Sequence, residues 1–161
     1  MEQAHSIMAY REALVKTIER MEPWRIWATL TFRERKSPYS AERHFRRFVR
    51  VICSDRREPV WSFYGIEWFQ DGEAVHIHAL IGYMTPCLVR PFWEWWHDRY
   101  GRALIEVYNP HKGAAWYVTK YIFKERTGLA WWNFFDWKPK GYLTSGRDAI
   151  QLFQGEGRCF L

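Results

Sequence analysis

Two histidines alternate with an isoleucine in His76-Ile77-His78, inside an apolar stretch of the chain. Side chains two residues apart on a β-strand point to the same face, so a strand here would present both imidazoles together and turn Ile77 to the other side. Two imidazoles on one face are half of a divalent-metal site. The pattern is short, and a packed structural pair of histidines is the alternative interpretation.

A carboxylate is expected beside these histidines. Asp71-Gly72, between two apolar stretches, is a strong signal for a two-residue hairpin loop. That loop brings Glu67 directly opposite His76, on the face shared by His78. The three side chains would then hold Mg²⁺ or Mn²⁺ and leave coordination positions open for a phosphate. A shift of one residue in the register would turn Glu67 away, and a solvent-facing glutamate is the alternative.

Nucleophiles are expected on a second element, where the unit Tyr-x-x-Lys occurs twice in succession. Tyr117 and Tyr121 are four residues apart, so an α-helix would stack the two phenols on one face, with Lys120 and Lys124 beside them. A free phenol has a pKa of about 10, and nearby cations favour the phenolate that attacks a phosphodiester. A packed aromatic stripe with solvated lysines is the alternative.

These residues need a sheet and a helix to position them. We expect helices over residues 4–22, 40–55, 92–100 and 110–126, with Ser40 as the N-cap of the second, and strands over residues 24–32, 60–69, 74–83 and 103–108. After the first helix this order is β-α-β-β-α-β, which folds most simply as a split βαβ (ferredoxin/RRM-like) antiparallel sheet. The sequence therefore predicts an α+β fold with an N-terminal helix and a C-terminal helix that bears the tyrosines. The segment from Leu129 is aromatic, and its pattern assigns no element.

Three motifs, in this order, resemble those of the HUH endonuclease superfamily: the strand over residues 27–32, the His76-Ile77-His78 pair and the tyrosine helix. The chain looks most like a rolling-circle replication initiator. The doubled Tyr-x-x-Lys resembles the two-tyrosine initiators of small circular phages and some plasmids. The resemblance spans residues 24–126, and it implies the split βαβ sheet with the histidine pair facing the tyrosine helix.

The resemblance implies metal-dependent, site-specific nicking and joining of single-stranded DNA. His76 and His78 would be metal ligands, and Tyr117 would attack phosphorus to leave a 3′-hydroxyl and a 5′-phosphotyrosine link. Tyr121 could attack a second junction, and Lys120 and Lys124 match the lysines of the motif. Such a link conserves the bond energy, which agrees with the absence of a Walker-type glycine loop from the sequence. The implied partner is single-stranded DNA at an origin or hairpin, and a host helicase is a further candidate.

We expect a nuclease domain over residues 1–128, with its core at 24–126, and an aromatic-rich extension over 129–161 packed on the same domain. Two alternatives remain open. A single-strand transposase of the same superfamily shares the histidine pair. A non-catalytic RRM-like protein would bind single strands by stacking on exposed aromatic residues, without cleavage and without a metal.

Charge points to a polyanionic partner. The 161 residues carry 24 Lys and Arg against 18 Asp and Glu, and all of the net charge of +6 lies in residues 33–57. The second helix has an apolar stripe predicted at Phe45, Phe48, Val49 and Ile52. Its arginines lie mostly opposite that stripe and are therefore predicted to contact DNA phosphates: Arg43, Arg46, Arg47 and Arg50. A merely solvated helix face is the alternative.

Several classes of protein are disfavoured. The cysteines, Cys53, Cys87 and Cys159, are too widely spaced for a zinc ribbon and odd in number, which indicates reduced thiols in a cytoplasmic protein. No apolar run approaches the about 20 residues of a membrane span, and no secretory signal is expected. Together with the resemblance, these features predict a cytoplasmic protein of a prokaryotic cell, encoded by a plasmid or a virus, with no membrane partner.

Overall fold

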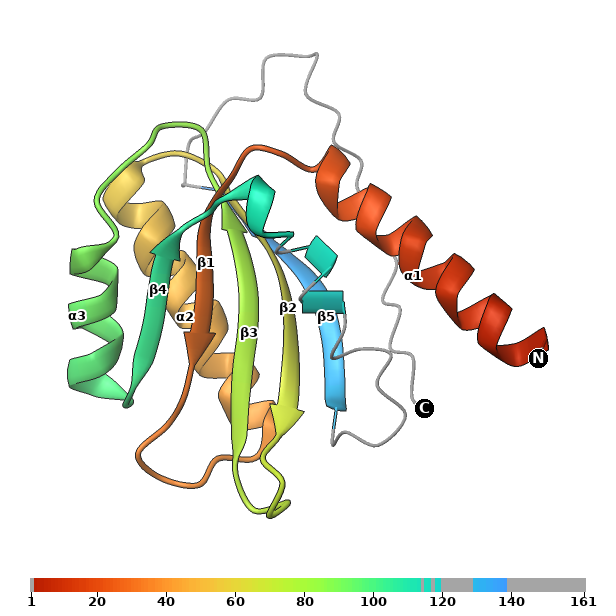
Figure 1. Ribbon diagram of the computed structural model, residues 1–161. Coiled ribbons are helices and arrows are strands. Elements are labelled where there is room, and N and C mark those ends of the chain that lie inside the picture. The colour runs from red at the N-terminus through yellow and green to blue at the C-terminus, as the bar shows by residue number, and fades with distance from the viewer. Residues whose placement is uncertain (1, 114, 117, 120–128, 139–161) are drawn as a thin grey trace.

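The computed structural model describes residues 2–113, 115, 116, 118, 119 and 129–138, and Figure 1 shows how the elements are arranged. The described part contains three α-helices, one short 3-10 helix (η1) and five strands. In chain order these are α1 (Glu2–Arg20), β1 (Trp24–Leu30), α2 (Pro38–Arg56), β2 (Val60–Trp68), β3 (Val75–Gly82), α3 (Arg90–Arg99), β4 (Ala103–Val107), η1 (Pro110–Lys112) and β5 (Leu129–Trp137).

The five strands form one antiparallel sheet in the order β4-β1-β3-β2-β5. The predicted α+β fold class is therefore confirmed. β3, which carries the histidine pair, is the central strand and is paired on both sides, with β1 and with β2. A central strand has its backbone groups fixed by two ladders, so its side chains are held in a rigid position.

Helices α2 and α3 cover one face of this sheet, and Figure 1 shows α2 crossing behind the strands. The apolar residues of α2 recur at spacings of three and four, which gives the buried stripe Phe45, Phe48, Val49 and Ile52 that the sequence predicted. The alternate residues of β1 and β3 that point this way pack against the two helices: Ile26, Ala28, Leu30, Ile77, Ala79 and Ile81. This face is thus filled by core side chains.

The other face of the sheet carries α1 and the candidate site. Leu14, Val15 and Ile18 of α1 pack in a second core cluster with Phe63 of β2 and Leu80 of β3. Successive side chains alternate between faces, so the positions two and four residues from Phe63 and Leu80 lie on this same side. Glu67, His76 and His78 occupy those positions and lie beyond the apolar cluster.

Two helix boundaries differ from the sequence-based expectation. Ser37, not Ser40, is the N-cap of α2, because its Oγ accepts a hydrogen bond from the backbone N–H of Ser40 at 3.2 Å and Pro38 occupies the first turn. The helix expected from residue 110 starts instead as the 3-10 turn η1. Gly113 ends this turn with a φ of 63°, a left-handed conformation that interrupts a right-handed helix.

Residues 129–137, to which the sequence pattern assigned no element, form the edge strand β5 beside β2. Strand pairing is supported by a side chain, because Oγ of Ser62 donates a hydrogen bond to the carbonyl oxygen of Phe135 at 3.0 Å. Residues 139–161 of the expected extension lie outside the described residues. Within the described part, no helix is long and apolar enough to cross a bilayer.

Candidate metal centre

Glu67 and His76 lie opposite each other in the β2–β3 ladder, as the hairpin register predicted. The loop itself is longer than expected. The backbone N–H of Phe69 donates to the carbonyl oxygen of Ala74 at 2.8 Å, and a tight turn is closed by the N–H of Gly72, which donates back to Phe69 at 2.9 Å. The register is unchanged because the longer loop takes one residue from each strand.

Three side chains converge on this face: Glu67, His76 and His78. Oε2 of Glu67 lies 3.1 Å from Nε2 of His76 and 3.5 Å from Nε2 of His78. One ligand atom from each of the three lies within 4.8 Å of the others. Glu67 is only 6% exposed and His78 only 5%. Among the described residues this is the one cluster of His, Cys, Asp and Glu side chains that could hold a metal ion.

The protonation states of the cluster suit a metal. Burial tends to raise the pKa of Glu67, but hydrogen bonds and charge from the two histidines outweigh it and lower this pKa to about 2. Burial lowers the pKa of His78 below its usual value, more strongly than Glu67 raises it. At neutral pH the cluster therefore presents a carboxylate and a neutral His78 imidazole, and these are the forms that coordinate metals.

Thr29 of β1 orients the His78 ring. Its Oγ1 lies 3.2 Å from Nδ1 of His78, and the two residues are paired in the β1–β3 ladder. When Nδ1 carries the proton and donates it to this hydroxyl, Nε2 is left with a lone pair that a metal ion could accept. Trp27 stacks on the same imidazole, with ring centroids 6.0 Å apart and an angle of 22° between the planes. The ring is thus held in the orientation that directs Nε2 into the cluster.

The donor atoms fit a divalent ion. Ligands held at about 2.1 Å from an ion, at right or tetrahedral angles, lie roughly 3.0–3.4 Å apart, which is close to the two distances from the Glu67 carboxylate. Nδ1 of His76 is buried and has no hydrogen-bond partner among the described residues. The fold therefore leaves a nitrogen of this ring to be satisfied by a ligand or by solvent. One carboxylate and two imidazoles leave coordination positions open for a substrate.

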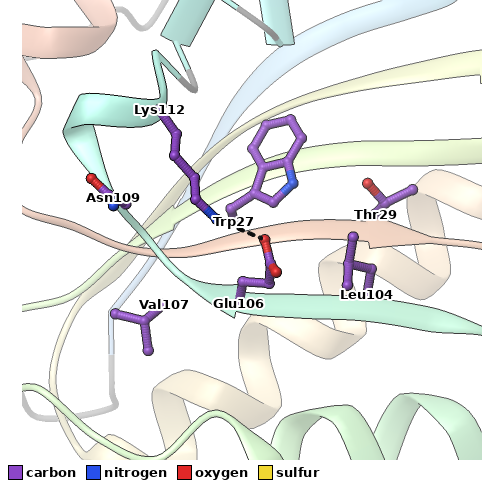
Figure 2. Close-up of a pocket in the computed structure, with 7 residues that line it drawn as sticks. All are labelled: Trp27, Thr29, Leu104, Glu106, Val107, Asn109 and Lys112. Carbon is purple, nitrogen blue, oxygen red and sulfur yellow. Dashed lines mark ion pairs between the residues drawn. The ribbon is translucent and has the colours of Figure 1, made fainter.

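A shallow pocket of about 230 Å³ adjoins the cluster between β1, β4 and η1, and Figure 2 shows the side chains that line it. Thr29 belongs to both the pocket and the cluster, so the two are contiguous. Nζ of Lys112 and Oε2 of Glu106 are 4.0 Å apart across the pocket. The remaining lining residues are Trp27, Leu104, Val107 and Asn109.

The predicted nucleophiles Tyr117 and Tyr121, with Lys120 and Lys124, lie outside the described residues. Their described neighbours 115, 116, 118 and 119 have helical backbone. Ala115 and Val118 are buried in the apolar cluster on the same face of the sheet as the candidate centre. Arg11 of α1 holds this segment, because its guanidinium donates to the carbonyl oxygen of Trp116 at 2.7 Å and to Oγ1 of Thr119 at 3.3 Å.

The four arginines predicted to contact DNA lie on α2, which covers the opposite face of the sheet. Arg46 donates two hydrogen bonds to Glu42, at 3.1 and 2.8 Å, and its guanidinium lies 4.6 Å from the centre of an aromatic ring of β5. Arg50 lies 4.2 Å over another ring of that strand. Arg43 and Arg47 are exposed, and within the described part of the chain neither makes an ion pair. The two pairs of arginines thus have different surroundings.

Sequence reasoning missed Thr29 and Trp27. Alternation along the strand puts both on one face, but it does not say which strand lies next to the histidines. The contact between Thr29 and His78 joins positions 49 residues apart, and no local pattern reports such a pairing.

Neither a scan against protein-family models nor searches of the curated proteins and of the solved structures finds a match for this chain. The candidate centre therefore rests on its own geometry.

Proposed function

We propose that this protein is a metal-dependent nuclease that nicks and rejoins single-stranded DNA through a 5′-phosphotyrosine intermediate, the reaction that starts rolling-circle replication of a plasmid or phage. The observation that carries the proposal is the convergence of Glu67, His76 and His78 on a central strand, on a sheet face that is not filled by the main core. Coordination positions left open on that face suit a phosphate oxygen of the substrate.

We infer two interleaved β-α-β units, one running through α2 and one through α3, with β5 added at the edge beside β2. The strand order β4-β1-β3-β2 supports this, since β1 and β2 flank β3 and each pairs with it in the antiparallel sense. In such a sheet the helix that follows β4 is free to return over the face with the histidines.

The residues have separate roles. A bound divalent ion would polarise the scissile phosphate and offset its charge. Glu67, His76 and His78 would hold that ion, and the contact of Thr29 Oγ1 with Nδ1 would hold the His78 ring in place. The phenolic oxygen of Tyr117 attacks phosphorus in line, its proton passes to solvent, and the 3′-oxygen of the upstream nucleotide leaves and takes up a proton. One phosphate ester bond is formed for each one broken, so attack by a 3′-hydroxyl on the phosphotyrosine can reverse the step. Tyr121 serves a second junction.

The tyrosine assignment has structural support from its neighbours. Ala115 and Val118 are 3% and 1% exposed in a cluster with Phe63 and Leu80, which are two residues from Gly65 and His78 along their strands. A helix anchored there starts on the face that carries the candidate centre.

The decisive test looks for a covalent adduct. The protein is incubated with Mn²⁺ and a pool of random-sequence single-stranded DNA oligonucleotides, labelled at either the 3′ or the 5′ end, and is run on a denaturing gel. A 5′-phosphotyrosine link retains the 3′ fragment, so only the 3′-labelled pool should label the protein. Tyr117→Phe should remove the main adduct, while Tyr39→Phe, which changes a tyrosine that is 73% exposed on α2, should not.

Metal dependence is tested in the same assay. His78→Ala and EDTA should each abolish the adduct, whereas His97→Ala, which alters a surface histidine stacked on Trp93 of α3, should leave it intact. An adduct that survives Tyr117→Phe combined with Tyr121→Phe would show that the nucleophile is another residue. DNA binding without any adduct, unaffected by EDTA, would favour the non-catalytic binder.

The donor set also bears on which ion is used. Imidazole nitrogens suit Mn²⁺ and the later transition metals better than Mg²⁺, which prefers oxygen ligands. Two histidines among three protein ligands therefore favour Mn²⁺ over Mg²⁺. Isothermal titration of the protein alone with each chloride salt measures this preference without any DNA, and an equal affinity for both ions would contradict it.

A further inference from the structure

We propose that the pocket between β1, β4 and η1, here called the Trp27 pocket, binds one nucleobase of the DNA strand and prefers a base that carries an exocyclic amino group. The pocket is lined by Trp27, Thr29, Leu104, Glu106, Val107, Asn109 and Lys112. This inference rests on the proposed function, because it names the part of the substrate that lies next to the scissile phosphate.

The Trp27 pocket lies next to the candidate metal centre. Thr29 lines the pocket with its side chain and lies 3.2 Å from Nδ1 of His78 through its hydroxyl. Trp27 lines the pocket and stacks on the same imidazole. A nucleotide whose phosphate reaches the cluster therefore has its own base, or that of its neighbour, within reach of this pocket.

The size and the walls of the pocket suit a flat ring. Its volume of about 230 Å³ is below the roughly 300–1,000 Å³ of sites that enclose a whole drug-sized molecule, so it fits one ring system rather than a complete nucleotide. Leu104, a large apolar side chain that is 51% exposed, lies beside it together with the indole of Trp27. Apolar and aromatic side chains of this kind bind nucleobases of single strands by stacking and van der Waals contact.

The charged side chains of the pocket indicate that it binds the polar edge of a nucleobase rather than a phosphate. Glu106 would repel a phosphate, and Lys112, 4.0 Å from it, compensates its charge within the pocket. A carboxylate accepts hydrogen bonds, and the matching donor on a base is an exocyclic amino group such as N4 of cytosine. Oδ1 of Asn109 already accepts the backbone N–H of His111 at 2.9 Å, so its amide nitrogen is the group that can donate to a ring acceptor.

Comparing the affinity for cytosine with that for thymine distinguishes a base-specific pocket from general binding of single strands. Both are pyrimidines of similar size, but cytosine presents an amino group where thymine presents the O4 acceptor. O4 placed against the Glu106 carboxylate would be repelled. In an oligonucleotide of one base, every position along the strand offers the same base to the pocket. The origin sequence therefore need not be known.

The experiment measures fluorescence anisotropy of dye-labelled dC8 and dT8 with the full chain in EDTA, at one fixed salt concentration. The wild-type protein should bind dC8 about tenfold more tightly, the factor expected for one hydrogen bond to a charged group. Glu106→Gln should reduce that ratio to near one, because the amide can also donate to O4. Glu94→Gln is the matched control: Glu94 on α3 is 49% exposed and paired with an arginine, and Glu106 is 46% exposed and paired with a lysine.

Three outcomes would overturn the inference: equal affinity of the wild type for the two oligonucleotides, an unchanged ratio in Glu106→Gln, or the same loss of ratio in Glu94→Gln. Because the assay contains EDTA, it is independent of cleavage. A clear dC8 preference with no covalent adduct would retain the base pocket and reject the nuclease, whereas an adduct with no base preference would reject only the pocket.

Discussion

The hydroxyl of Thr29 gives the sharpest test of the candidate metal centre. Thr29→Val replaces Oγ1 by a methyl group of nearly the same shape and keeps a β-branched residue in β1, so strand packing is preserved. The change removes the hydrogen-bonding partner that lies 3.2 Å from Nδ1 of His78. The His78 ring then loses the contact that holds Nε2 in position to bind a metal.

The size of the effect follows from this geometry. Removing a partner that orients a metal-binding histidine typically lowers metal affinity about 10- to 100-fold, or roughly 1.4–2.7 kcal/mol. The distance of 3.2 Å in this protein is at the long end of the range for N–H···O hydrogen bonds, so we expect the lower value, about tenfold. His78 is buried, so the loss of this partner should also lower the free energy of unfolding by about 1–3 kcal/mol.

Isothermal titration with MnCl₂ measures the affinity, and thermal unfolding with and without the ion provides a second measurement. At 100 times its dissociation constant, Mn²⁺ should stabilise the wild-type protein by about 2.7 kcal/mol. The same concentration should stabilise Thr29→Val by about 1.4 kcal/mol. Thr29→Ser keeps the hydroxyl and is the control. The reasoning is refuted if the valine variant binds Mn²⁺ as tightly as the wild type, or if the serine variant is equally impaired.

Three further changes test other parts of the structure. Tyr64→Phe removes the hydrogen bond of 2.5 Å that this buried hydroxyl donates to a carboxylate of α2 and should lower the free energy of unfolding in urea by about 1.5–3 kcal/mol. Arg43→Gln combined with Arg47→Gln should reduce the slope of log Kd against log salt for single-stranded DNA by about 1.4, since each phosphate contact contributes about 0.7. Gly82→Ala should cost about 1–3 kcal/mol of stability because the new Cβ would overlap the indole of Trp61.

The first two of these changes have matched controls. Tyr39→Phe alters an exposed tyrosine and should change stability by less than about 0.5 kcal/mol; a cost equal to that of Tyr64→Phe would mean that the buried hydrogen bond is not the cause. Arg90→Gln changes an exposed arginine of α3 and should leave the salt slope alone. An unaltered slope in the double arginine variant would remove α2 from the DNA-binding surface. If Gly82→Ala unfolds with the wild-type midpoint, the close approach of the indole is tolerated.

The hairpin explains why the grouping of Glu67 with the two histidines could be predicted from the sequence. Glu67 and His76 are nine residues apart, and the turn signal between them determines their pairing locally. The expected loop of two residues was wrong, since the loop has four. The pairing was nevertheless right, because the longer loop removes one residue from each strand and leaves the same residues opposite each other. Thr29 could not be found in this way, since its pairing with His78 depends on how distant strands are ordered in the sheet.

Helix and strand ends were less predictable for a different reason. Ser37 and Ser40 can both cap a helix, and their residue types do not distinguish them. The choice is made by Pro38, whose fixed φ suits the first turn and whose missing N–H costs nothing there. The edge strand β5 was not predicted because its six large apolar or aromatic residues, among nine, occupy both odd and even positions, so no alternation of period two marks it in the sequence.

The charge pattern of α2 did not predict which face of the sheet its arginines would lie on. The sequence separates the polar face of this helix from its apolar face correctly, but the sheet has two faces, and only the fold decides that α2 lies on the one away from Glu67 and the histidines. Arg46 and Arg50 stack over rings of β5, so the exposed Arg43 and Arg47 lie on the helix that borders this edge of the sheet. β5 also pairs with β2, the strand that carries Glu67. A strand of DNA that passed from this helix to the candidate centre around the β5 edge would cross β5 and β2, whereas the Trp27 pocket lies toward the opposite edge, at β4.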